Sequence, residues 1–100
     1  MYKKTNPEIT FIEFIKLVGP VAHFNSLEGE EYVVTKLQGS IMLFVRTLTG
    51  KPDDMELRSV LQAYKELKEF QTENFKPYVP FTHSPALGLL LHLKLLIKVG

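Results

Sequence analysis

Three histidines are the residues best suited to metal chemistry, and their spacing argues against a metal site. His23, His83 and His92 stand far apart, and none has a second ligand three or four residues away. That spacing is how a helix presents two ligands to one ion. His92 lies in an apolar segment, where an imidazole satisfied inside a core or interface is a simpler interpretation than a pH-sensitive group. We therefore expect no metal and no cofactor.

Three carboxylates gather in the middle of the chain, at Asp53, Asp54 and Glu56. They come directly before an amphipathic pattern, so Asp53 or Asp54 is expected to cap a helix rather than to catalyse a reaction. A nuclease signature running to Arg58 is rejected, because its acid and base would have to come from adjoining strands. Gly50-Lys51 lacks the glycine spacing of a phosphate loop, and no nucleophile motif occurs. We expect a non-catalytic protein, unless a site is assembled from residues distant in sequence.

The most apolar stretch runs from Ser84 to Lys98 and is dominated by leucine. Ser84 followed by Pro85 is typical of a helix start, so we predict a helix over Pro85 to Lys98. Its leucines fall on all sides of a helical wheel, and such a helix must be covered nearly all round. It is shorter than the roughly 20 residues that a membrane span needs. If a second molecule covers it, the interface residues are Leu87, Leu91, Lys94, Leu95 and Lys98; the alternative is that the helix forms the middle of a monomer's core.

Nucleic-acid binding is the alternative function. Predicted helical segments at 54–70, 73–78 and 85–98 could imitate a helix-turn-helix in the C-terminal half of the chain. The last segment has too few polar side chains for a recognition helix, which must reach base edges or phosphates. The contacts would instead come from basic and aromatic residues at Arg46, Lys51, Lys65, Lys68, Lys76 and Tyr78.

Composition favours one ordinary globular domain over residues 1–100. The chain is 45% apolar and 23% charged, and its net charge of +1 is far from the excess that phosphate-binding proteins carry. There is no cysteine, which fits a reducing compartment and leads us to expect a cytoplasmic protein. The basic N-terminus has no apolar stretch behind it, so a secretory signal is not expected. Partners are expected to be a protein or a second copy of the chain, with nucleic acid as the alternative and no membrane.

The remaining patterns predict the elements that would carry these residues. Thr10 and Glu13 form a capping box before a helix at 11–18, which Gly19-Pro20 ends. Two antiparallel strands are predicted at 32–37 and 40–48, with a turn at Gln38-Gly39. A third strand at 21–24 is an option, and a helix over 27–37 is the competing interpretation. Residues 41–45 are apolar on both faces of a strand, as expected of a central strand or of one covered on each side, so the second strand is expected to be interior. An amphipathic helix is predicted from Asp54 to Phe70.

Residues Met42 to Lys51 resemble the first strand and turn of ubiquitin. Ubiquitin-like folds continue with a second strand directly after that turn, whereas Pro52-Asp53-Asp54 is expected here to open a helix. The resemblance covers about a tenth of the chain and does not enter the fold prediction. We predict an α+β protein with a short N-terminal helix, a two- or three-stranded antiparallel sheet and a C-terminal helical pair whose Leu-rich last helix is buried. The predicted function is protein interaction or oligomerisation through that apolar helix surface.

Overall fold

The computed structural model describes all of residues 1–100, and its largest element is a four-stranded antiparallel sheet. Each strand of this sheet pairs with the next one along the chain, so the sheet is a simple meander. The predicted sheet of two or three strands is therefore wrong, although the α+β class is confirmed. The four strands are β2 (His23–Asn25), β3 (Glu31–Gln38), β4 (Ile41–Arg46) and β5 (Lys51–Glu56).

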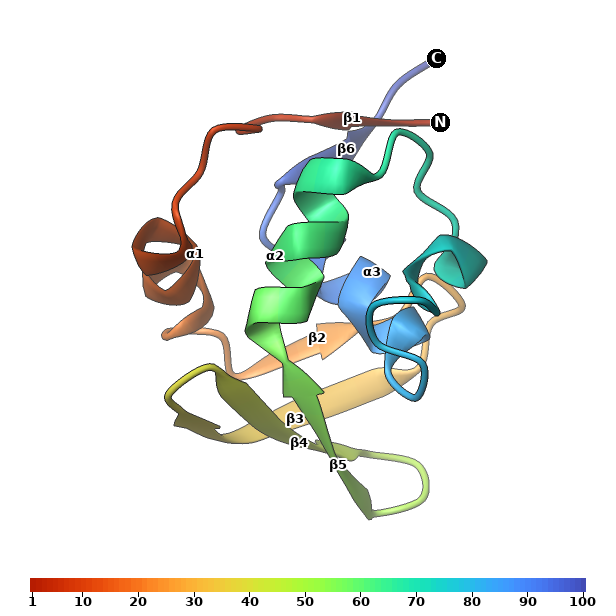
Figure 1. Ribbon diagram of the computed structural model, residues 1–100. Helices are drawn as coiled ribbons and strands as arrows, with labels where there is room; N and C mark the ends of the chain where they lie inside the picture. Colours follow the sequence, from red (N-terminus) through yellow and green to blue (C-terminus); the bar gives the residue numbers. More distant parts are fainter.

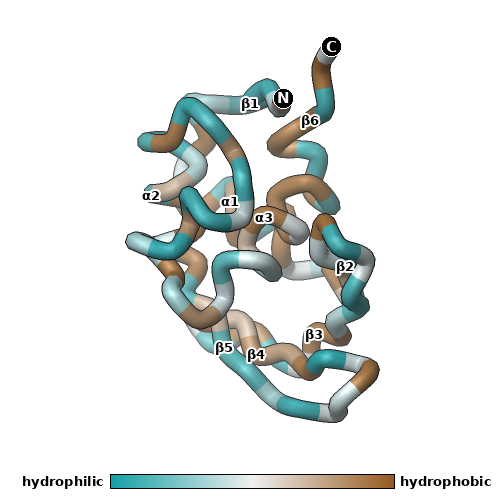
Figure 2. Tube along the Cα trace, turned by 90° about the vertical axis from the view of Figure 1, so that its right-hand side faces the viewer, coloured by the Kyte–Doolittle hydropathy of each residue, from teal (hydrophilic) through white to brown (hydrophobic).

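Three helices lie on one side of this sheet and leave its other side without a covering element (Figure 1). The tube view from a perpendicular direction agrees, with the apolar α3 in the middle of the molecule and the polar β5 at the margin (Figure 2). A short 3₁₀ turn, η1 (Thr72–Phe75), packs beside α3. The helices are α1 (Phe11–Val18), α2 (Leu57–Glu66) and α3 (His83–His92).

The first helix, α1, is confirmed with the predicted bounds, because its start and stop signals are local. The Thr10 hydroxyl accepts a hydrogen bond from the Glu13 amide at 3.2 Å, and the Glu13 carboxylate accepts one from the Thr10 amide at 2.9 Å. These reciprocal bonds satisfy two amides that the helix leaves free. Phe14 and Val18 are its buried residues and face the core.

The predicted strand pair is confirmed as β3 and β4, and the competing helix over 27–37 does not form. Gly39 has a φ of +58° in the tight turn between the two strands, a conformation that glycine adopts without steric cost. The optional third strand exists as β2. A register shift between Val34 and Lys36 marks a bulge in β3.

The predicted helix from Asp54 to Phe70 is wrong at both ends. Residues 51–56 form β5, which pairs along its whole length with β4, from Arg46–Lys51 to Ile41–Glu56. The helix α2 starts only at Leu57, and its cap is Glu56, whose carboxylate accepts a hydrogen bond from the Arg58 amide at 2.9 Å. The premise that a helix follows the turn after β4 is therefore wrong as well. Four residues of the predicted apolar stripe, Leu57, Val60, Leu61 and Tyr64, are buried, whereas the fifth, Leu67, follows the end of the helix and is half-buried.

The Leu-rich segment is buried as predicted but is shorter as a helix than predicted. α3 begins at His83 and ends at His92, and its residues 85–90 are all buried. The chain then turns at Lys94, which has a φ of +60°, and continues as the strand β6 (Leu96–Lys98). β6 pairs antiparallel with β1 (Tyr2–Lys4) in a second sheet, so the predicted C-terminal helical pair is wrong.

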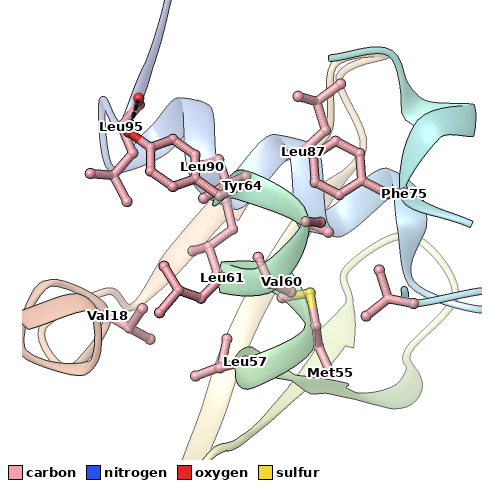
Figure 3. Close-up of a cluster of buried hydrophobic side chains, with 14 of the residues drawn as sticks. Val18, Met55, Leu57, Val60, Leu61, Tyr64, Phe75, Leu87, Leu90 and Leu95 are labelled. Atoms are coloured by element: carbon pink, nitrogen blue, oxygen red, sulfur yellow. Dashed lines mark hydrogen bonds between the residues drawn. The ribbon is translucent and has the colours of Figure 1, made fainter. Parts of the chain in front are cut away.

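The helices and the covered face of the sheet share one core. Figure 3 shows α2 residues meeting Leu87 and Leu90 of α3, with Phe75 and Met55 beside them. The buried Tyr64 hydroxyl donates a hydrogen bond to the Leu95 carbonyl oxygen and accepts one from the Asn6 amide, both at 3.0 Å. This hydroxyl therefore ties α2 to both ends of the chain. None of the helices has the length and apolar character that crossing a bilayer requires.

Candidate protein-interaction surface

The side of the four-stranded sheet turned away from the helices carries apolar side chains that do not belong to the core. Side chains alternate between the two sides of each strand, so the strand register assigns every residue to a side. Tyr32, Met42, Phe44 and Met55 point to the helices and are 2% exposed or less. The residues between them point the other way. We call this side the outer face; its central residues are Val33, Lys36, Ile41, Leu43, Val45, Pro52 and Asp54.

The outer face is arranged in three cross-strand rows around β4, the first of which has Ile41 between Gln38 and Glu56. In one row, Val45 lies between its partners Val33 and Pro52, and all three side chains are apolar. In the next row, Leu43 lies between Lys36 and Asp54. The result is an apolar stripe along β4 with a positive charge on its β3 side and a negative charge on its β5 side.

The apolar residues of this stripe are only partly shielded from water. Val33 is 42% exposed, and Ile41, Leu43 and Val45 are half-buried by their neighbours in the sheet. None of these four side chains is among those that pack against the core, whereas Val34 and Leu37 of the same hairpin are. The partial burial of the stripe therefore comes from the sheet itself, and no helix or loop closes over it.

The edges of the sheet are protected against pairing with another strand, unlike its face. The edge strand β5 carries Pro52, which has no amide hydrogen, and the charged residues Asp53 and Asp54. Proline and charge on an edge strand both discourage the addition of a further strand. The opposite edge, β2, is only three residues long. Contact with another molecule through this sheet would therefore use its outer face.

Lys36 and Asp54 have no opposite charge bound to them within the chain. The single salt bridge joins Arg46 to Glu30, at 3.5 Å, at the margin of the sheet. The Arg46 guanidinium also lies 5.8 Å from the centre of the Tyr32 ring. Burial of Tyr32, together with its hydrogen bond to the Glu30 carboxylate, raises the pKa of its hydroxyl. The charges at the margin are thus engaged, whereas those beside Leu43 are free for another molecule.

The interface predicted on the last helix is largely inside the molecule. Leu87 and Leu95 are buried, and Leu91 is half-buried. Lys94 and Lys98 are exposed, but they lie in the turn after α3 and in β6 rather than on a helix. The leucines are covered by this chain, so their apolar character requires no second molecule.

The residues predicted for nucleic-acid binding do not form one patch. Arg46 and Lys51 belong to the β4–β5 hairpin, whereas Lys65 and Lys68 lie at or beyond the far end of α2 (Figure 1). Arg46 is paired with Glu30, as described above. Lys76 follows η1, and the Tyr78 hydroxyl donates a hydrogen bond to the Glu66 carboxylate at 2.9 Å.

The three histidines do not come together in one site, and two of them line a surface hollow. His23 and His92 line a hollow of ≈ 390 Å³ beside Leu17, and a ring nitrogen of His83 lies 2.9 Å from the Pro80 carbonyl oxygen. No group of three or more His, Cys, Asp or Glu side chains is placed to hold a metal ion. A further hollow, of ≈ 660 Å³, lies between Met1-Tyr2, Leu27 and residues 68–73.

The sequence did carry a signal for the outer face. Residues 41–45 are apolar without alternation, which predicted a central strand or one covered on each side. The structure makes β4 a central strand, between β3 and β5, and covers only one of its faces. The positions of Lys36 and Asp54 on either side of Leu43 could not be predicted, because β5 was expected to be part of a helix.

Comparison with known proteins adds no relative: the chain matches no family model, and no curated protein or solved structure is similar to it at a significant level.

Proposed function

We propose that this chain is a non-catalytic protein-interaction module whose contact surface is the outer face of the four-stranded sheet. The observation that carries the proposal is the apolar stripe of Ile41, Leu43 and Val45, which no part of the chain covers. The class of function is the one expected from the sequence, but the contact surface moves from the last helix to the sheet because Leu87 and Leu95 are buried.

An open sheet face normally carries polar side chains that alternate with buried apolar ones. In β4 the outward positions are apolar throughout, so the strand has the composition of one that is covered on both sides. Covering such a stripe removes apolar surface from water, which favours association. The absence of cysteine fits action in a reducing compartment such as the cytoplasm.

A photo-crosslinking residue placed at Leu43 tests the proposal in cells that produce the protein. We expect one or a few discrete crosslinked products, because the stripe is in contact with a specific surface. The matched control is the same residue at Ile12, which is 68% exposed on α1, outside the sheet. Ile12 should give none of these products. Products common to both positions, or no product at Leu43, would remove the outer face as a contact surface.

A further inference from the structure

We infer that the outer face docks on the outer face of a second copy of this chain, with Lys36 of each copy opposite Asp54 of the other. This inference rests on the proposed function and names the partner that occupies the same surface. The register of β3, β4 and β5 and the charges on either side of Leu43 favour a second copy as the partner.

The register makes the outer face complementary to itself. Two sheets stacked face to face lie about 10 Å apart, and in aligned sandwiches their strands cross at about 30°. A two-fold axis along β4 places the β3 of one copy over the β5 of the other. Lys36 of each copy then faces Asp54 of the other, Val33 faces Pro52, and Leu43 faces Leu43. In these two rows every position meets a side chain of matching character, as a symmetric dimer requires.

The other in-plane two-fold axis, at right angles to the strands, is disfavoured by charge. It places Lys36 over Lys36 and Asp54 over Asp54, and like charges brought together at an interface oppose association. Because Lys36 and Asp54 flank Leu43 in one cross-strand row, the charges select a single arrangement of the two copies. Neither residue has a partner within the chain, so pairing across the dimer breaks no existing salt bridge.

The size of the face predicts a weak dimer. Three neighbouring strands about 4.8 Å apart and six residues long, at about 3.4 Å per residue, give a flat area of roughly 200–300 Å² per copy. Stable interfaces bury about 800 Å² per partner, and smaller ones belong to transient complexes. We therefore expect dissociation constants of about 10 µM or weaker.

Sedimentation velocity from about 10 µM to 1 mM, on the full chain, tests the inference through charge reversal. Wild type should show a concentration-dependent dimer. Lys36→Asp and Asp54→Lys should each weaken dimerisation at least about 10-fold, because each variant places two pairs of like charges across the interface. The double variant K36D/D54K should dimerise again, since it restores both pairs with their signs exchanged. Both positions are exposed, so the fold should be unaffected, and circular dichroism with thermal melts checks this.

The sharpest result comes from mixing the two single variants in equal amounts. One then carries two aspartates at these positions and the other carries two lysines, so the mixed dimer should form more tightly than the dimer of either variant alone. If the mixed dimer does not form, or if all variants dimerise as strongly as wild type, the inferred arrangement is wrong. Strictly monomeric wild type at 1 mM would overturn self-docking.

Failure of self-docking is distinguishable from failure of the proposed function. Monomeric protein that still gives a discrete crosslinked product from Leu43, with a mass other than twice that of the chain, rejects the second copy and keeps the interaction surface. Monomeric protein without any such product rejects both.

Discussion

The two faces of β4 carry side chains of the same chemical kind but face different surroundings. Met42 and Phe44 point to the helices and are 0% and 2% exposed, whereas Ile41, Leu43 and Val45 point outwards and remain half-buried. Sequence alone makes the two sets equivalent, since both are large and apolar. Apolar side chains on both faces of a strand indicate that burying both faces is favourable. They do not indicate whether the chain itself covers both.

The largest expected effect is the difference in stability lost when a residue on each face of β4 is replaced by alanine. Phe44→Ala should lower the free energy of unfolding by about 3–5 kcal/mol, because it removes a buried ring and leaves a cavity. That ring lies 5.4 Å from the Tyr32 ring, edge to face. Leu43→Ala, one residue away on the outer face, should cost the monomer less than about 1 kcal/mol. Urea unfolding at low micromolar concentration measures both values. Equal losses would mean that the outer face is part of the core.

The next effect concerns how closely the helical layer approaches the sheet. A side-chain carbon at Gly88 of α3 would clash with the Asn25 carbonyl oxygen and lie 2.9 Å from the Cα of Ser26. Gly88→Ala should therefore destabilise the fold by about 1–3 kcal/mol, although alanine favours a helix more than glycine does.

Gly19→Ala is the matched control, because its added carbon would have no neighbour closer than 3.5 Å and its φ of −48° is helical. Thermal denaturation should show a lower midpoint for the Gly88 variant and little change for the Gly19 variant. If both variants melt like wild type, the contact between α3 and β2 is looser than described.

The smallest effect is a pH dependence confined to the inner face. Burial first, and the Glu30 carboxylate second, raise the pKa of Tyr32, so the folded state resists ionisation of this hydroxyl. The resulting stabilisation is complete below the unfolded pKa of about 10 and is lost as the pH rises through the folded value. Tyr32→Phe should therefore flatten the loss of stability between about pH 9 and pH 11. Urea midpoints across that range measure it.

Val33→Thr, at the neighbouring position on the outer face, serves as the control for the pH dependence of stability. It should leave the alkaline loss of stability as in wild type. A Tyr32→Phe variant with the wild-type slope would show that other groups govern alkaline unfolding.

Elements with local signals were predictable from the sequence. The reciprocal bonds of Thr10 and Glu13 need only residues three apart, so α1 is confirmed with its bounds. The β3–β4 hairpin depends on neighbouring strands and a glycine at the turn, and it too is confirmed. The apolar stripe of α2 follows from residues three and four apart, and those residues are indeed buried.

Elements that depend on distant partners were not predictable. Pro52, Asp53 and Asp54 are poor strand formers, yet they extend because β4 supplies a pairing edge and Met55 is buried on the inner side. Residues 96–98 look helical after the six leucines from Leu87 to Leu95, but their partner is β1, at the opposite end of the chain. Tertiary pairing overrides local preference in both cases.

The pairing of β1 with β6 makes the folded backbone nearly circular. Tyr2 lies opposite Lys98, and the Met1 carbonyl oxygen accepts a hydrogen bond from the Val99 amide at 3.0 Å. Bringing such remote residues together has the largest entropic cost of loop closure in the molecule, so this small sheet should form last during folding. A short covalent bridge between Met1 and Gly100 would hold these ends together in the unfolded chain too, so the chain would lose less conformational entropy on folding. A cyclised form should therefore unfold more slowly, without any new contact in the folded state.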